Sequence, residues 1–153
     1  MNLFMLGLNL CLRNNCKMIN KKILAIIKSD KGKFLLLKTN PRWLKVDAWY
    51  IVTGGLEKGE TYEDGVKREV SEETGLKIMK IIPTEYACDY AWPEGSGKMH
   101  HEKAFIVIVK AANPILSREH TAFKWLSKDK FVEKVAWWGD NAKRDLKKLL
   151  KDY

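Results

Sequence analysis

The chain has 153 residues, of which 46% are hydrophobic and 31% are charged, and its formal net charge is +9. This length suits one domain with a real core, and the composition excludes an intrinsically disordered chain. The positive charge favours polyanionic partners such as nucleotides, polyphosphates or RNA without choosing among them. It is equally consistent with a solvated basic surface that has no specific partner.

The N-terminal segment is apolar but lacks the marks of a targeting signal. Residues 1–12 have no basic start and no small-residue cleavage pattern after them, and Asn9 interrupts them. Apolar residues alternate from Phe4 to Leu12, which predicts an added strand; an alternative is that Met18 begins the working domain. We therefore predict an N-terminal extension over residues 1–20 and one domain over residues 21–153.

Two further features bear on the compartment. No run reaches the roughly 18 apolar residues that a membrane span needs, so no membrane partner is expected. The cysteines are odd in number and form no CxxC pair, which is typical of free thiols in a reducing compartment: Cys11, Cys16 and Cys88. We predict a cytoplasmic protein without a zinc site.

The first expected elements are strands. Short aliphatic runs at Ile23–Lys28 and Lys33–Lys38 flank Asp30–Gly32, which predicts a hairpin. A polar loop follows over Thr39–Asp47, and Trp49–Thr53 is a β-rich segment that runs into a glycine turn.

A helix is expected next. Thr61 with Asp64 three residues later resembles a capping box, and Gly75 stands where a glycine ends a helix. Tyr62, Val66 and Val70 form an apolar stripe that can pack on the core.

The rest of the chain predicts further strands and two short helices. The expected elements are strands at Leu76–Ile82, Thr84–Trp92, Phe105–Val109 and Thr121–Leu126, a turn at Pro93–Gly97, a short helix from Ser127 through Val135, and a basic helix at Asn141–Lys151. Together they predict an α+β domain in which helices flank a mixed β-sheet.

One face of the expected central helix is acidic. Glu69, Glu72 and Glu73 stand at positions i, i+3 and i+4, so their carboxylates share a side of the helix. Such close like charges repel and raise one another's pKa, which a divalent cation would offset; hard oxygen ligands suit Mg²⁺ or Mn²⁺. For these three residues alone, a surface helix rich in charge pairs is the more common explanation.

The residues around this face strengthen the case for a metal site. Arg68 can reach Glu72 one turn along the helix, or Glu60 before it, and either contact would orient the acidic groups. Glycines at Gly54, Gly55 and Gly59 permit a tight turn that brings backbone close to a metal or to phosphates.

The whole segment from Gly54 to Leu76 resembles the Nudix box, G-x5-E-x7-R-E-U-x-E-E-x-G-U, where U is aliphatic. Every position matches: Gly54, Glu60, Arg68, Glu69, Val70, Glu72, Glu73, Gly75 and Leu76. A chance match is on the order of one in ten million, given average residue usage. The resemblance covers roughly Ile23 to Leu150 and implies the Nudix α/β/α sandwich.

This resemblance implies the roles of the box residues. Glu69 and Glu73 would be the principal ligands of Mg²⁺ or Mn²⁺, with Glu72 assisting and a backbone carbonyl near Gly54 completing the site. Arg68 and Glu60 would hold loop and helix together, with Gly75 closing the motif. The implied reaction is cleavage of a phosphoanhydride bond, in which such ions neutralise phosphate oxygens and activate water.

The general base is a separate question, with two candidates. Glu119 opens a segment, EHTAFKWL, that resembles the E-H-x-x-[YF]-[KR]-W-L segment of diadenosine tetraphosphate hydrolases and dihydroneopterin triphosphate (dATP) pyrophosphatases. The other candidate is Glu102, next to His100 and His101. These histidines could touch phosphate, although exposed loop histidines are the more common explanation.

The expected substrate is a nucleoside polyphosphate or a related compound. Trp43 could stack on a base or pterin ring, as could Trp92, Trp137 and Trp138, although each tryptophan is more often a packing residue. Lys45, Gly55 and Glu57 are the further candidates for substrate binding. RNA 5′-end hydrolysis, ADP-ribose hydrolysis and a non-catalytic nucleotide sensor remain alternatives.

Overall fold

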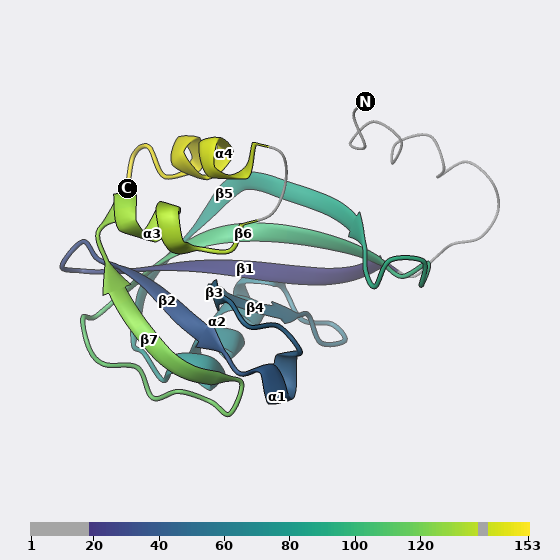
Figure 1. Ribbon diagram of the computed structural model, residues 1–153, viewed down its shortest axis with the longest axis horizontal. Helices are drawn as coiled ribbons and strands as arrows, with labels where there is room; N and C mark the ends of the chain where they lie inside the picture. The colour runs from purple at the N-terminus through teal and green to yellow at the C-terminus, as the bar shows by residue number, and fades with distance from the viewer. Residues whose placement is uncertain (1–18, 138–140) are drawn as a thin grey trace.

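The computed structural model describes residues 19–137 and 141–153 as a single sheet with helices on both faces (Figure 1). The elements are, in chain order, β1 (Ile19–Ser29), β2 (Phe34–Thr39), α1 (Pro41–Leu44), β3 (Trp49–Tyr50), β4 (Val52–Gly55), α2 (Tyr62–Thr74), β5 (Ile78–Ala91), β6 (Met99–Val109), β7 (His120–Leu126), α3 (Lys128–Lys134) and α4 (Ala142–Leu149). The strand predicted between Phe4 and Leu12 lies outside the described residues, as do Cys11, Cys16 and Trp138.

The sheet is mixed, as predicted. Seven strands take part, in the order β3-β2-β1-β6-β5, with β4 also paired to β1 and β7 also paired to β2. The pair β1–β6 is parallel over Ile19–Ser29 and Met99–Val109, and every other pairing is antiparallel. β1 is central, and its residues from Ile23 to Ile27 are buried on both faces.

Each face of the sheet packs on its own helices. On one face, Ile23, Ala25 and Val107 pack with Val66 and Val70 of α2. On the other face, Leu24, Ile26 and Ile106 pack with α3 and α4 through Phe131, Val132, Leu146 and Leu150. Figure 1 shows the same three layers, with α2 below the sheet and α3 and α4 above it. The predicted α/β/α sandwich is therefore confirmed.

Several predicted boundaries were wrong. The strand expected at Trp49–Thr53 is two strands, β3 and β4, which pair with β2 and β1, and the strand expected at Phe105–Val109 begins at Met99. The strands expected on either side of Pro83 are one strand, β5, with a register shift between Pro83 and Ala87. β5 lies at an edge of the sheet, where the missing N–H of a proline costs no ladder bond. The expected loop over Thr39–Asp47 contains α1, in which Asn40 caps the helix and Pro41 takes its first position.

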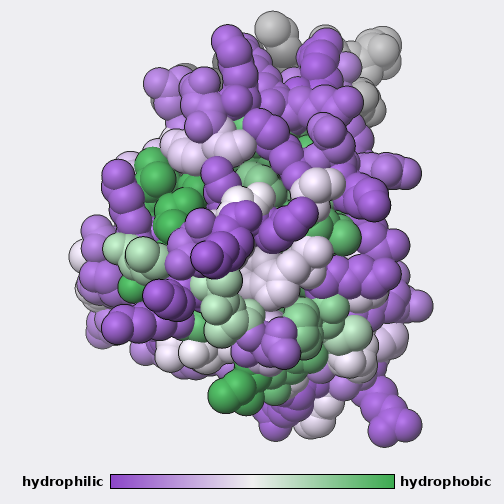
Figure 2. All heavy atoms as spheres, turned by 90° about the vertical axis from the view of Figure 1, so that its left-hand side faces the viewer, coloured by the Kyte–Doolittle hydropathy of each residue, from purple (hydrophilic) through white to green (hydrophobic). Residues whose placement is uncertain are grey.

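The surface carries mostly polar side chains. Seen from the left-hand side of Figure 1, hydrophilic atoms cover most of the molecule and apolar atoms form separate patches (Figure 2). None of the helices within the described residues is both long enough and apolar enough to cross a membrane. Cys88, the cysteine within these residues, is a free thiol, as predicted.

Candidate metal and phosphate site

The helix α2 is held at both ends by the residues that the sequence singled out. Oγ1 of Thr61 accepts a hydrogen bond from the backbone N–H of Asp64 at 3.1 Å. At the other end Gly75 adopts a left-handed conformation, with φ of 62°, and its N–H donates to the carbonyl of Ser71. Because Val66 and Val70 are fully buried against the sheet, the acidic side of α2 has a fixed direction.

The three carboxylates of α2 differ strongly in exposure. The side chain of Glu72 is 61% exposed, whereas those of Glu69 and Glu73 are 12% and 6% exposed. Glu72 therefore meets solvent, whereas Glu69 and Glu73 are largely covered by neighbouring residues.

Glu69 packs directly on the glycine turn. A Cβ atom placed on Gly54 would lie 1.8 Å from Oε1 of Glu69, closer than any non-bonded contact allows. The same test at Gly55 meets no atom within 4 Å. Gly54 is thus the position where the absence of a side chain lets a carboxylate lie against the end of β4.

Arg68 joins the turn to the helix. Its guanidinium donates to both oxygens of Glu60, from Nε at 2.9 Å and from Nη2 at 3.0 Å, and Nη2 also donates to the carbonyl of Gly55 at 2.8 Å. Nη1 donates to Glu69 at 2.7 Å and lies 3.6 Å from Glu72. Both predicted partners, Glu60 and Glu72, are therefore contacted.

These contacts organise the turn between β4 and α2. The hydrogen bond from Arg68 keeps the pKa of Glu60 below its usual value, and Glu60 in turn accepts the backbone N–H of Glu57 at 2.8 Å. The Glu57 carboxylate is 73% exposed and lies 4.0 Å from Nε of Arg68. A loop ordered in this way presents Gly55 and Glu57 beside the acidic face.

His120, which the sequence reasoning missed, contacts the most buried carboxylate. Nε2 of His120 lies 2.7 Å from Oε2 of Glu73, and both side chains are buried. A shift of register brings the histidine there: Lys38 pairs with Ala122, but Thr39 pairs with His120. Two residues of β7 thus span one step of β2, so His120 faces α2 instead of the opposite side. The sequence feature that could have indicated a role for His120 is its neighbour Glu119, which the sequence predicts as a candidate base.

Burial and like charges perturb the acidic groups. Burial raises the pKa of Glu73 to about 7; Glu69 and Glu119 add to this, and the hydrogen bond from His120 opposes it. Burial also raises the pKa of Glu69, against the effect of Arg68, and the charges of Glu72 and Glu119 act in the same direction as burial. The carboxylates of Glu69, Glu73 and Glu119 are therefore close enough to interact.

Glu102 lies elsewhere. It is on β6, on the face that carries Ala104 and Ile106 and packs toward α3 and α4, not toward α2. Burial raises its pKa, and Tyr90 donates a hydrogen bond to it at 3.1 Å. The reading of His100 and His101 as loop histidines was wrong, because both are paired residues of β6.

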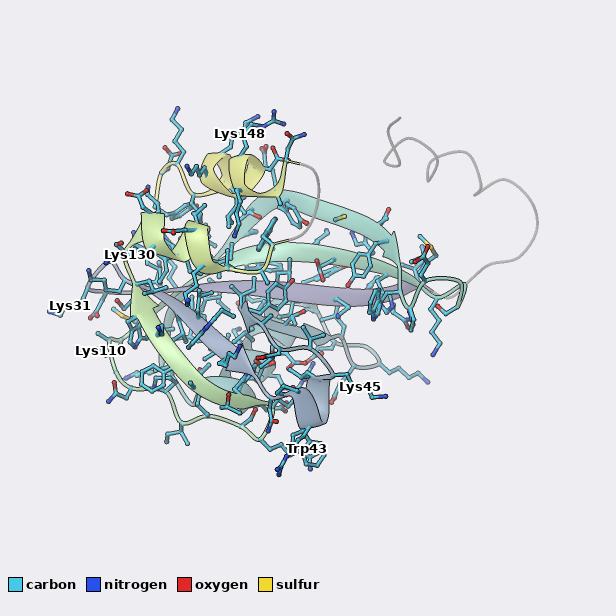
Figure 3. All side chains as sticks on the ribbon, in the orientation of Figure 1. Lys31, Trp43, Lys45, Lys110, Lys130 and Lys148 are labelled. Carbon is cyan, nitrogen blue, oxygen red and sulfur yellow. The ribbon has the colours of Figure 1, made fainter. Side chains whose placement is uncertain are left out.

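Trp43 and Lys45 lie beside the loop that carries Glu119. The backbone N–H of Asn40 donates to the carbonyl of Glu119 at 2.8 Å, which ties α1 to the start of β7. The guanidinium of Arg118 lies 4.2 Å from the centre of the Trp43 ring, and Trp43 is 52% exposed. Figure 3 shows Trp43 and Lys45 projecting into solvent at this end of the molecule.

The other tryptophans differ in their surroundings. Trp137 is 9% exposed and its ring meets Tyr86 edge-on at 5.4 Å, so it is a packing residue of the α3–α4 layer. Trp92 is 62% exposed and stands in the turn between β5 and β6.

The donor set fits a hard divalent cation by its chemistry, but it is not gathered as a finished site. Within residues 19–137 and 141–153, no three His, Cys, Asp or Glu side chains converge in the manner of a metal centre. The hydrogen bond from Arg68 holds Oε1 of Glu69. Ion binding by Oε1 of Glu69 would therefore require this oxygen to leave Arg68.

Comparison with known proteins identifies relatives of the whole domain. The family model described as NUDIX domain matches residues 18–149. The chain is 29% identical over 120 residues to an octanoyltransferase of Myxococcus xanthus, covering 76% of this chain and 33% of that protein. It is 30% identical over 102 residues to the NAD-capped RNA hydrolase NUDT12 of Homo sapiens, covering 59% of this chain and 21% of that protein. The chain thus spans a third or less of either relative.

A solved structure agrees with the architecture. The dihydroneopterin triphosphate pyrophosphohydrolase of E. coli superposes with a TM-score of 0.68 at 20% identity, covering 90% of this chain and 100% of that one. At this identity, the likeness concerns the fold.

Proposed function

The chain belongs to the Nudix family, and we propose that it hydrolyses a phosphoanhydride bond in a nucleoside polyphosphate or a related compound, with Mg²⁺ or Mn²⁺ as cofactor. The observation that carries this proposal is the packing of Glu69 against Gly54, one helical turn from the buried Glu73, with the charge of Glu119 acting on both; burial and these like charges raise the pKa of Glu69 and of Glu73. Buried carboxylates that repel one another are costly without a cation, even though Arg68 and His120 each supply one partner.

In this proposal the carboxylates have different roles. Glu69 and Glu73 would hold the ion, Glu72 would assist from the solvent side, and the carbonyl of Gly54 would supply a further oxygen. A bound divalent ion neutralises phosphate charge and makes water a better nucleophile. Arg68 keeps the Gly55–Glu60 loop in register with α2, and His120 fixes the direction of the Glu73 carboxylate.

We assign the role of general base to Glu119. Its charge acts on both Glu69 and Glu73, whereas the charged groups that act on Glu102 are Lys22 and His100. Glu102 also faces the α3–α4 layer. A general base must reach the attacking water next to the proposed metal ligands Glu69 and Glu73, which favours Glu119.

The substrate would approach from the end of the molecule that carries α1. Trp43 offers an exposed ring on which a base would stack. The phosphates would bind near the exposed residues Lys45, Gly55 and Glu57. The EHTAFKWL segment supports triphosphates of nucleosides or pterins and dinucleoside polyphosphates as the substrate class. The likeness to NUDT12 favours capped RNA as the second candidate.

The test is a screen for release of phosphate or pyrophosphate with and without Mg²⁺. The substrates are nucleoside triphosphates, a dinucleoside polyphosphate, ADP-ribose and capped RNA. Glu73→Gln and Glu119→Gln are measured beside Glu63→Gln, a matched change on the exposed first turn of α2, where Glu63 pairs with Lys67. We expect Glu119→Gln to lose about 10²-fold or more in rate, as for the loss of a general base. Glu73→Gln should lose at least as much because it removes a proposed metal ligand, and Glu63→Gln should keep its rate. Wild-type rates in Glu73→Gln would overturn the proposal.

A further inference from the structure

A hollow of about 480 Å³ lies between α3 and the sheet, on the face opposite α2. We name it the Trp49 pocket; its walls are Trp49, Lys124, Leu126, Lys130, Glu133 and Lys134. Its size is within the range of pockets that hold small ligands. Trp49 is paired with Lys38 of β2, and Lys124 and Leu126 come from β7, so the pocket joins α3 to the sheet edge. Figure 3 shows Lys130 on α3 above this edge.

Lysines surround the tryptophan ring. The ammonium nitrogens of Lys124, Lys134 and Lys38 lie 5.1, 5.5 and 6.0 Å from the centre of the Trp49 ring. Each contact is a favourable cation–π interaction, but the three positive charges repel one another. An anion between them would remove that repulsion.

Few carboxylates neutralise this cluster. Lys38 pairs with Asp47, and Glu133 is the acidic residue on the wall. Within the part of the chain that the structure describes, no ion pair joins Lys124, Lys130 or Lys134 to a carboxylate. All three lysines are exposed. The pocket therefore carries an excess of positive charge around an aromatic ring.

We propose that the Trp49 pocket binds single-stranded nucleic acid, with one base stacked on Trp49 and the adjacent phosphates on Lys124, Lys130 and Lys134. Aromatic stacking combined with a basic groove is the common way in which proteins bind single strands without reading their sequence. Lys130 and Lys134 are one helical turn apart, so they form a row that suits successive phosphates better than one compact anion.

The strand β7 joins the pocket to the acidic face. β7 begins at His120, which contacts Glu73, and reaches Lys124 about 14 Å farther on at roughly 3.4 Å per residue. Because the pocket and the acidic face lie on opposite sides of the sheet, a bound strand would reach the acidic face only by passing around β7. The site goes beyond the proposed hydrolysis and does not require it, because none of its lysines is among the groups placed around Glu73.

Fluorescence anisotropy with a labelled oligoadenylate RNA of about ten nucleotides tests the proposal, in salt from about 50 to 200 mM. The pocket variant is Lys124→Glu with Lys134→Glu. Its matched control is Lys77→Glu with Lys80→Glu at β5, the opposite edge of the sheet, which changes the net charge equally. Trp49→Leu and Trp49→Phe test stacking, and thermal melting monitors the folding of every variant.

We expect the pocket variant to bind at least tenfold more weakly and its salt slope to fall by roughly 1.4, as two lost phosphate contacts predict. The β5 control should change less than about threefold, since it leaves the pocket intact. Trp49→Leu should weaken binding about tenfold, and Trp49→Phe should restore most of it. Phosphate release from the best small substrate should be unchanged in the pocket variant, which separates this site from the proposed hydrolysis.

Several results would overturn the assignment. Equal weakening in the pocket variant and the β5 control would mean that net charge alone attracts RNA. Competition by free AMP as strong as that by the oligonucleotide would mean a mononucleotide site. Undetectable binding of the oligonucleotide by the wild-type protein would remove the site altogether, even if hydrolysis were found.

Discussion

Nε2 of His120 and Oε2 of Glu73 lie 2.7 Å apart although 47 residues separate them in the chain. Both side chains are buried, so removal of the imidazole leaves a carboxylate with neither water nor a donor. We expect His120→Ala to lower the free energy of unfolding by about 3 kcal/mol at pH 8, as for other buried pairs that lose one partner. Urea denaturation measures this value.

A double-mutant cycle isolates the pair. In Glu73→Gln the carboxylate is gone, so the further change His120→Ala should cost about 1–2 kcal/mol less than it does in the wild-type background. Additive effects would show that His120 acts through packing and not through Glu73.

Gly54 and Gly55 form a matched pair of neighbouring glycines. A methyl group on Gly54 collides with Glu69, whereas one on Gly55 meets open space. Gly54→Ala should therefore destabilise the protein by about 1–3 kcal/mol through overpacking, or displace Glu69, and Gly55→Ala should change stability by less than about 0.5 kcal/mol. Thermal melting of both variants without added metal gives the comparison. Equal melting temperatures would show that Glu69 moves away at no cost.

The segment from Thr61 to Gly75 could be predicted from the sequence because its determinants are local. The cap, the glycine stop and the Val66–Val70 stripe all lie within the helix or next to it, and α2 has the predicted limits to within one residue. The contacts of Arg68 were also predictable, since Glu60 and Glu72 are near in sequence.

What could not be predicted depends on pairing between distant strands. The direction of His120 follows from a register shift against Thr39, which no pattern within β7 indicates. The Trp49 pocket likewise needs β3, β7 and α3 to meet. Pro83 was read as a break because the sequence does not reveal that β5 is an edge strand, where proline is tolerated.

We expect Arg68 to support catalysis through the several N–H donors of its guanidinium more than through its positive charge. Lysine in its place keeps one positive charge but cannot reach Glu60, Glu69 and Gly55 together. We expect Arg68→Lys to lower kcat by roughly 10- to 100-fold, because the loop and Glu69 lose their fixed positions. The control is Lys67→Ala on the exposed side of α2, where the pair with Glu63 contributes little. A variant Arg68→Lys with the wild-type kcat would contradict the positioning role.

Glu102 gives the protein a stability that depends on pH. Burial raises the pKa of this carboxyl in the folded state, and the ionisable groups around it come from four strands: Lys22 of β1, Tyr50 of β3, Tyr86, Cys88 and Tyr90 of β5, and His100 of β6. A carboxyl with a raised folded-state pKa contributes stability at pH values below its unfolded pKa. That contribution is lost as the pH rises through the folded pKa, since ionisation of a buried carboxyl is then favoured by unfolding.

Glutamine at this position stays neutral at every pH and keeps an oxygen for the Tyr90 hydroxyl. The difference in unfolding free energy, Glu102→Gln minus wild type, should therefore increase from pH 4 toward pH 8, with the variant relatively more stable at the alkaline end. Urea denaturation across this range measures the difference, and Glu85→Gln on β5 serves as a control that leaves the buried carboxyl in place. A difference that stays flat with pH would mean that Glu102 ionises as easily in the folded protein as in the unfolded chain.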